Sequence, residues 1–103
     1  MNDIPAARNV NRCPTHPGEL LREDVIPATG RTKTEIARLL GISRQHLHDI
    51  LEEKKPVSAP VAIRLGKMFG DGGGLWLKMQ DAYDLWHAAR PVDTSGIPTI
   101  KAA

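Results

Sequence analysis

The 103-residue chain lacks the features that mark secreted, membrane-spanning and disulfide-bonded proteins. Its single cysteine, Cys13, can form no internal disulfide and has no second thiol with which to hold a metal ion. No apolar run approaches the length of a membrane span, and the first residues do not have the pattern of a signal peptide. We therefore expect a soluble cytoplasmic protein that does not enter a membrane.

The sequence also lacks the residue patterns of an enzyme. It shows no nucleophile–base–acid set, and its glycine run at residues 72–74 follows no predicted strand and precedes no Gly-Lys-Ser/Thr sequence. His46 and His48 lie about 200° apart around a helix, so they cannot chelate one metal ion together. We expect no catalytic activity, no metal ion and no cofactor.

Aromatic residues make up only 4% of the chain, and the net charge is only +2. A chain of this length is expected to form one domain with a modest, mostly aliphatic core. The charge is unevenly distributed, because residues 31–67 carry a net +4 and the rest of the chain −2. Positive charge concentrated on one stretch suits phosphate binding, whereas the small net charge alone would not indicate nucleic acid.

Residues 32–53 have the pattern of two short helices joined by a tight turn. Thr32 and Glu35 form a Thr-x-x-Glu capping box at the start of the first helix. Gly41 stands where a left-handed residue would end that helix, and Ser43 is a good N-cap for the second. Helices joined by such a turn form a helix-turn-helix, whose second helix enters the major groove of DNA.

The apolar residues of this motif fall on one face of each predicted helix. On the first helix they are Ile36, Leu39 and Leu40, and on the second they are Leu47, Ile50 and Leu51. The opposite face of the second helix is polar, with Gln45, Asp49 and Glu52. Ala37 is small at the position where the two helices must cross closely. Because a plain helical hairpin needs no such placement, we favour the helix-turn-helix.

A helix is predicted before the motif, over residues 15–26. Pro17 suits its first turn, and Pro27 is expected to end it. Its inward stripe comprises Leu20, Leu21 and Val25. His16 stands at the helix start with no acidic or thiol partner nearby in the sequence, so capping or packing is favoured over a role as ligand or base.

Two further helices are predicted after the motif. Ser58 should cap the first of them, with Pro60 in its first turn and Gly70 at its end. Its inward stripe comprises Ala62, Leu65, Met68 and Phe69. Residues 71–74 are interpreted as a flexible joint because they contain three consecutive glycines. The last helix is predicted over residues 75–89.

Four large side chains recur on one face of this last helix, namely Trp76, Met79, Tyr83 and Trp86. This face can complete the core of one chain or form the interface of a homodimer, and all four residues are candidates for that interface. We favour the core for Trp76. We favour the interface for Tyr83 and Trp86, which lie further from the centre of the predicted domain.

The predicted domain extends over residues 15–90, with the motif at 32–53. Residues 1–14 lack periodicity and are expected to form a tail, although Asn9, Arg12 and Cys13 could become ordered on a partner. Residues 91–103 are expected to form a second tail.

Three segments of the chain resemble the HigA family of antitoxins, within the larger group of Xre and Cro-repressor-like helix-turn-helix proteins. They are HPGELL at residues 16–21, TEIARLLGISRQ at 34–45 and WLKMQDAYDL at 76–85. The central segment alone indicates only an Xre-like protein, and the two flanking segments narrow the likeness to the HigA type. One departure is the glycine run at 72–74, which stands where family members usually have a Ser-Pro-Glu-like cap.

The resemblance implies an all-α, five-helix domain of the Xre/lambda-repressor-like type with short flexible tails. It implies a homodimer that binds double-stranded operator DNA at an inverted repeat and represses its own operon. It also implies neutralisation of a small RelE-like or HigB-like toxin that cleaves mRNA on the ribosome. A stand-alone Xre-type repressor without a toxin partner stays open as the alternative, and a small basic protein encoded next to this chain would distinguish the two.

The second helix of the motif is expected to present its first residues to the base edges. Arg44 can grip O6 and N7 of guanine, and Gln45 can grip N6 and N7 of adenine. His48 and Asp49 follow on the same exposed side, where the Asp49 carboxylate could accept from cytosine N4 but would also repel phosphate. The expected phosphate contacts are Lys33, Thr34, Ser43, His46, Lys54 and Lys55. For His46, Lys54 and Lys55 an ordinary exposed residue stays an equal alternative.

Overall fold

The first helix runs without a break from Pro17 to Thr29 but changes its winding twice. The computed structural model describes residues 12–101, and within them this helix comprises α2 (Pro17–Leu20), the π-helical stretch η1 (Leu21–Val25) and α3 (Ile26–Thr29). His16 caps its start, because the imidazole Nδ1 accepts a hydrogen bond of 2.9 Å from the N–H of Gly18. The predicted capping role of His16 is therefore confirmed.

The prediction that Pro27 ends the first helix is wrong. The backbone widens into π winding just before the proline, and the N–H of Ile26 donates to the carbonyl of Leu21 five residues earlier. A bulge of this kind shifts the hydrogen-bond ladder, so the helix accommodates the missing N–H of Pro27 and continues for another turn. It ends instead at Gly30, whose φ of 70° is left-handed.

The two helices of the predicted motif are α4 (Lys33–Leu40) and α5 (Arg44–Leu51). The hydroxyl of Thr32 accepts from the N–H of Glu35 at 3.1 Å, and the hydroxyl of Ser43 accepts from the N–H of His46 at 3.0 Å. Both predicted N-caps are thus confirmed. Gly41 ends α4 with a left-handed φ of 77°, which confirms the predicted turn.

The other half of the predicted capping box is absent. The carboxylate of Glu35 accepts from the guanidinium of Arg31 at 2.7 Å. Arg31 lies one turn earlier and offers this carboxylate a charged donor, which makes a stronger hydrogen bond than the neutral backbone N–H of Thr32. The start of α4 is therefore capped by the Thr32 hydroxyl, but the Glu35 carboxylate does not accept from the N–H of Thr32 in return.

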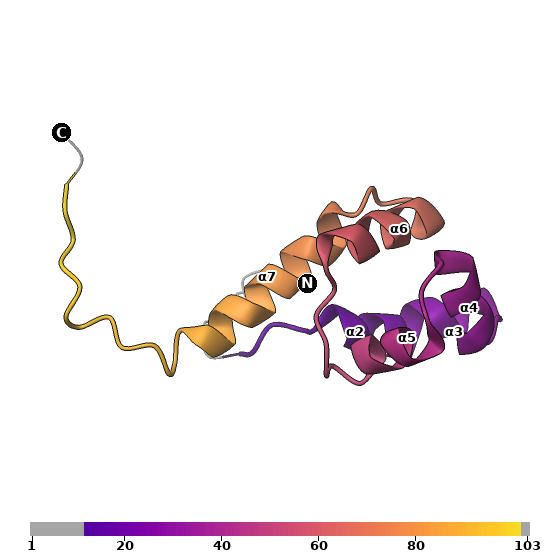
Figure 1. Cartoon of the computed structure of the whole chain (residues 1–103), viewed down its shortest axis with the longest axis horizontal. Helices are drawn as coiled ribbons and strands as arrows, with labels where there is room; N and C mark the ends of the chain where they lie inside the picture. The colour runs from indigo at the N-terminus through magenta and orange to yellow at the C-terminus, as the bar shows by residue number, and fades with distance from the viewer. Residues whose placement is uncertain (1–11, 102–103) are drawn as a thin grey trace, which may run out of the picture.

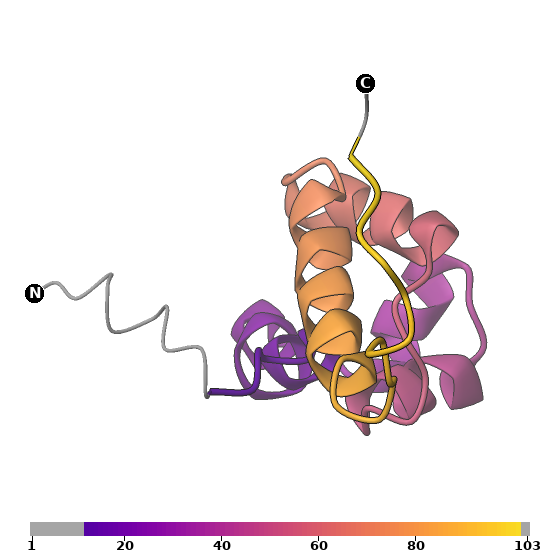
Figure 2. The ribbon, with the colours of Figure 1, turned by 90° about the vertical axis from the view of Figure 1, so that its left-hand side faces the viewer.

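Two longer helices complete the five-helix, all-α fold that the sequence predicts, with no strand in the described part of the chain. Helix α6 (Ala59–Phe69) begins at the predicted cap Ser58, whose hydroxyl accepts from the N–H of Val61, and it ends at Gly70. Helix α7 (Gly74–Ala88) lies within one residue of its predicted bounds. Figure 1 shows α7 leaving the other helices at one end, and Figure 2 shows it lying across the side of the domain.

The core is a single apolar cluster to which every helix contributes. Its largest fully buried side chains include Trp76 of α7, and Ala37 of α4 is 1% exposed. Other buried members are Leu21, Ile36, Leu40, Leu47, Ile50, Leu51, Val61, Ala62 and Leu65. Leu39 was predicted on this face but is 48% exposed. The core-facing side of α4 is centred between Ile36 and Ala37, which turns Leu39 towards solvent.

The glycine run before α7 lies in a turn that packs on α6 through Gly73, and the flexibility expected of this joint stays a prediction. Gly73 is buried with φ 92°, and a Cβ at this position would lie 2.8 Å from the carbonyl oxygen of Ala62. A Cβ at Gly66 of α6 would lie 2.0 Å from the backbone N of Gly73. The two glycines let the turn lie directly on the backbone of α6 and fix where α7 begins.

The two ends of the described chain differ in their contacts. Cys13 lies against the end of α7, with its Sγ 3.4 Å from Nε2 of His87. Beyond α7 the described chain has turns and irregular segments, and all of its residues up to Lys101 are exposed. Asn9 lies outside the described residues. None of the described helices is both long and apolar enough to cross a membrane.

Candidate nucleic-acid interface

The exposed face of α5 carries the side chains that the sequence predicts to read bases. Arg44, Gln45 and His48 are all exposed, and together they line a shallow hollow on the outer side of the helix. The opposite face of α5 is fixed in the core by Leu47, Ile50 and Leu51. The structure therefore brings three of the four predicted base-reading residues together on one accessible surface.

The fourth predicted residue, Asp49, is already paired within the chain. Its Oδ1 accepts from Nε2 of Gln45 at 2.9 Å, and its Oδ2 lies 3.6 Å from Nζ of Lys55. The hydrogen bond from Gln45, followed by the charge of Lys55, lowers the pKa of the Asp49 carboxyl below its ordinary value. Asp49 thus stays ionised and holds Gln45 in one orientation on the surface of α5.

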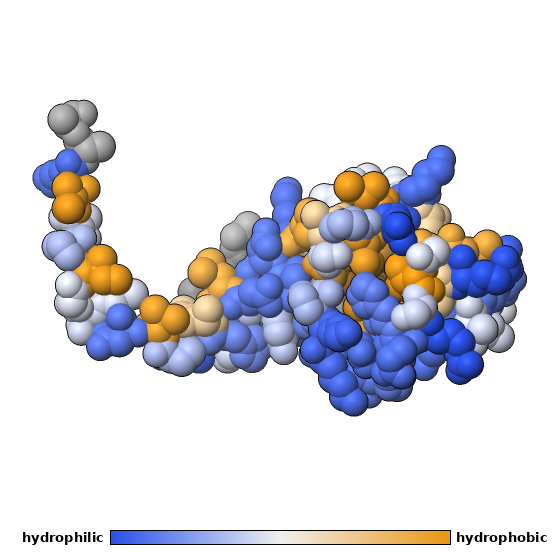
Figure 3. Space-filling model, viewed as in Figure 1, coloured by the Kyte–Doolittle hydropathy of each residue, from blue (hydrophilic) through white to orange (hydrophobic). Residues whose placement is uncertain are grey.

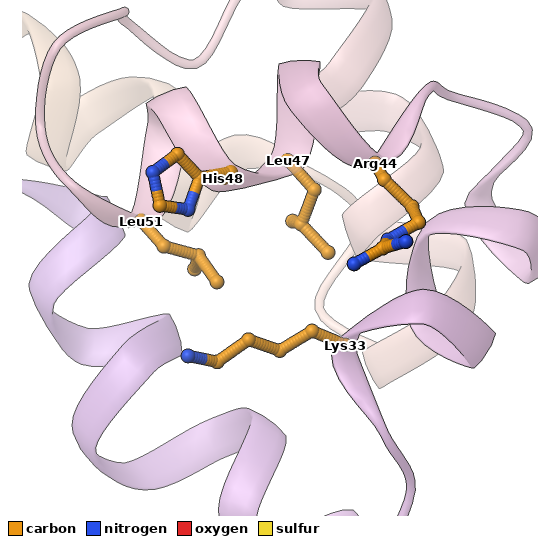
Figure 4. Close-up of a pocket in the computed structure, with 5 residues that line it drawn as sticks. All are labelled: Lys33, Arg44, Leu47, His48 and Leu51. Carbon is orange, nitrogen blue, oxygen red and sulfur yellow. The ribbon is translucent and has the colours of Figure 1, made fainter.

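A basic pocket of about 80 Å³ lies beside the start of α5 (Figure 4). Leu47 and Leu51 form its apolar floor, and its other lining residues are Lys33, Arg44 and His48. In Figure 4, Lys33 reaches across from the start of α4 and Arg44 points in from the first turn of α5. Cationic side chains without an acidic neighbour in the lining make this a place where an anionic group would be held.

The remaining predicted phosphate contacts are more scattered. Thr34 is exposed in the first turn of α4, and the hydroxyl of Ser43 is engaged as the N-cap of α5. His46 is half-buried. Lys54 and Lys55 follow α5 in an exposed turn, where both of their N–H groups donate to the carbonyl of Asp49. The surface over α5 is hydrophilic in Figure 3, whereas apolar residues gather over α6.

Two arginines that the sequence analysis did not single out hold the ends of the motif helices. Arg64 of α6 donates to the carbonyls of Leu40 and Gly41 at 3.3 and 2.9 Å. Arg22 of η1 donates to the carbonyl of Leu51 at 2.5 Å. These carbonyls end α4 and α5 and have no partner within their own helix. The arginines lie 24 and 29 residues away from Leu40 and Leu51, so no local pattern indicates the contacts.

A buried amide joins α7 to the turn after α5. Gln80 is 4% exposed, and its Oε1 accepts from the N–H of Val57 at 2.8 Å. Its Nε2 donates to the carboxylate of Asp84 at 2.9 Å. The only sequence signal for this role is that Gln80 lies on the same helical face as Trp76 and Tyr83.

The predicted dimer residues of α7 differ in how much surface they leave free. Trp76 is 1% exposed inside a single chain, so it belongs to the core and offers no surface to a second copy. Met79, Tyr83 and Trp86 are half-buried. Tyr83 packs edge-on against His16 with ring centroids 4.8 Å apart, and the guanidinium carbon of Arg90 lies 3.2 Å from the ring centre of Trp86.

A short turn between α4 and α5, with the first turn of α5 exposed and flanked by cations, defines a helix-turn-helix DNA-binding protein. No family model matches the chain. Individual proteins are nevertheless similar to this chain. A virulence-associated protein I of Dichelobacter nodosus is 38% identical over 82 residues, which cover 80% of this chain and 75% of the relative.

The antitoxin HigA-1 of Vibrio cholerae is 32% identical over 79 residues, which cover 77% of this chain and 74% of the antitoxin. The solved structure of the Pseudomonas aeruginosa antitoxin HigA with the higBA promoter superposes with a TM-score of 0.69 at 36% identity. That match covers 73% of this chain and 82% of the solved one. The chain belongs to the HigA-type antitoxins of the Xre-like helix-turn-helix group.

Proposed function

We propose that this chain is the antitoxin of a toxin–antitoxin pair and represses its own operon by binding an inverted repeat in the operator as a homodimer. The observation that carries the DNA-binding part is the exposed first turn of α5, where Arg44, Gln45 and His48 stand beside Lys33 of α4. The solved relative bound to promoter DNA supports the same role for this chain.

Base reading is proposed for Arg44, Gln45, His48 and Asp49, with two different tasks among them. Arg44 makes no ion pair within the described residues and is available to grip guanine O6 and N7. Gln45 donates one of the two protons on its Nε2 to Asp49, which leaves the second proton and Oε1 for the N7 and N6 of adenine. Asp49 acts mainly by orienting Gln45, because its own carboxylate is already occupied.

Phosphate binding is proposed for residues that surround this reading face: Lys33, Thr34, Ser43, His46, Lys54 and Lys55. Lys33 and Thr34 lie in the first turn of α4, where unpaired N–H groups and the helix dipole attract an anion. Lys33 also lines the basic pocket together with Arg44, which supports its proposed contact with a phosphate beside the bases that Arg44 reads. Lys55 would have to leave Asp49 before it could bind a phosphate.

A homodimer is proposed because one recognition helix makes too few base contacts for a useful preference over unrelated DNA. Met79, Tyr83 and Trp86 of α7 are the proposed interface, and Leu85 beside them is 71% exposed. A two-fold axis along this face would present two α5 helices to half-sites about one DNA turn, roughly 34 Å, apart or a multiple of that.

The toxin is proposed to be a small RelE-like protein encoded next to this chain, because this chain is similar to HigA-1 over three quarters of that antitoxin's length. The alternative is a stand-alone repressor that uses the same α5 residues and has no toxin partner. Expression of the adjacent reading frame alone should arrest growth, and co-expression of this chain should restore it. Growth that is unaffected by the adjacent frame would favour the stand-alone repressor.

The DNA-binding part is tested by footprinting on the DNA upstream of this reading frame. We expect the chain to protect an inverted repeat and the Arg44→Ala variant to lose that protection at the same concentration. No protected repeat in this region would contradict autorepression.

A further inference from the structure

A second surface, separate from α4 and α5, combines apolar walls with acidic edges. It is a groove of about 510 Å³ between the first helix and the junction of α6 with α7. Its walls include Val25 of η1, Phe69 at the end of α6, and Leu75 and Trp76 at the start of α7. Leu75 is 46% exposed, so the free chain leaves apolar surface in contact with water here.

The charges at this groove are acidic only. Asp24 and Asp71 are its two charged lining residues, and both are exposed. Asp71 uses one oxygen to accept from the N–H of Gly73, and Asp24 makes no ion pair or side-chain hydrogen bond within residues 12–101. The groove is built entirely from the part of the sequence that carries the net charge of −2, outside residues 31–67.

We infer that this groove is the docking surface for the toxin, and that the toxin presents an apolar side chain flanked by lysine or arginine to it. The charge favours this occupant, because two carboxylates beside an apolar floor attract a basic protein surface and repel nucleic acid. The apolar side chain covers Leu75 and Phe69, which removes apolar surface from water on both partners. The inference rests on the proposed antitoxin role, since it takes the toxin as the partner.

The position of the groove has a consequence for repression. None of its lining residues comes from α4 or α5, whereas the basic pocket is built from those two helices alone. The toxin can therefore occupy the groove while the first turn of α5 stays accessible to DNA. A complex of toxin and antitoxin is expected to bind the operator through the same α5 residues as the antitoxin alone.

The test is calorimetry of this chain with the purified protein from the adjacent reading frame. Leu75→Lys removes an apolar wall and adds repulsion, and Asp24→Lys reverses an edge charge; both sites are exposed, so the fold should tolerate the changes. The matched controls are Ile63→Lys, an exposed apolar residue of α6 outside the groove, and Asp81→Lys, an exposed acid of α7 outside it. Each groove variant should weaken toxin binding by about tenfold or more, and each control by less than about twofold.

Operator affinity is measured on the same four variants, so that failure of the groove inference can be distinguished from failure of the proposed antitoxin role. The groove variants should bind operator as tightly as the unaltered chain. Equal toxin affinity in all four variants would overturn the groove and leave the antitoxin role intact. No binding of the adjacent protein to the unaltered chain would instead contradict the antitoxin role itself. A Leu75→Lys chain that becomes monomeric would show that a second copy occupies the groove, which also overturns the inference.

Discussion

At the scale of single residues, Gly73 is a position that does not tolerate a side chain. Its φ of 92° is strained for any residue with a Cβ, and that Cβ would meet the backbone of Ala62 at 2.8 Å. We expect Gly73→Ala to lower the free energy of unfolding by more than about 2 kcal/mol, measured by urea denaturation. Gly74→Ala is the matched control, because its Cβ would enter open space in the first turn of α7. That change should leave stability unchanged or raise it by about 0.5 kcal/mol. Equal losses for the two variants would mean that the turn does not lie on α6.

His16 is the residue from which we expect a dependence of stability on pH. Burial lowers the pKa of its imidazole, outweighing the opposing effect of Glu53 and Asp84, and Arg22 lowers it further. The Nδ1 atom must also be unprotonated to accept from Gly18. Because the folded pKa lies below the unfolded one, the unfolded chain takes up the proton first, and stability falls as the pH drops below about 6.5.

This dependence is measured as the free energy of unfolding at pH 7.5 and at pH 5. His16→Asn keeps an N-cap acceptor but cannot take up this proton, so the difference between the two pH values should shrink. His48→Asn, on the exposed face of α5, serves as the control and should leave the difference nearly unchanged. A His16→Asn chain with the full difference would assign the pH dependence to other groups.

At the scale of helices, the crossing of α4 and α5 depends on Ala37. Its side chain is 1% exposed, and its carbonyl accepts from the N–H of Ile42 in the turn. We expect Ala37→Leu to overpack the crossing, to cost about 1–3 kcal/mol of stability and to weaken operator binding, although Ala37 touches no DNA. Leu39→Ala, two residues away on the exposed side of α4, should cost less than about 0.5 kcal/mol. Unchanged melting and operator affinity for Ala37→Leu would place the crossing elsewhere.

The sequence predicts the ends of most helices because their signals are local. Thr32, Ser43 and Ser58 each cap a helix through the N–H three residues later, and Gly41 and Gly70 end helices by left-handed backbone. The exposed polar face of α5 follows from the same local motif.

The features that the sequence does not predict depend on contacts between distant residues. The turn at Gly73 is fixed by Gly66 of another helix, and Arg64 reaches Leu40 across 24 residues. Pro27 continues its helix because the preceding residues adopt π winding, for which a single proline gives no signal. At Trp76 the preference for the core over the interface is confirmed, because its side chain is 1% exposed, whereas Trp86 is half-buried.

At the scale of the whole molecule, the proposed homodimer predicts that a variant can lose dimerisation and still fold. Changing Met79 and Trp86 together to Ser removes apolar side chains from the proposed interface and leaves the fully buried Trp76 in place. The variant should stay folded, sediment as a monomer and bind the operator more weakly than the unaltered chain. Asp81→Ser, an exposed change on another side of α7, should remain dimeric. A double variant that is still a dimer would place the interface outside α7.

We propose that α5 reads bases through Arg44 while Lys33 holds phosphate, and both residues line one basic pocket. The most direct test measures the affinity of Arg44→Ala and Lys33→Ala for operator and for unrelated DNA over a range of salt concentrations. We expect Arg44→Ala to cost about 1–3 kcal/mol on the operator and to reduce its preference over unrelated DNA. Lys33→Ala should weaken both DNAs alike and lower the slope of log affinity against log salt by about one. If both variants lose operator preference to the same degree, α5 is not the reading helix described above.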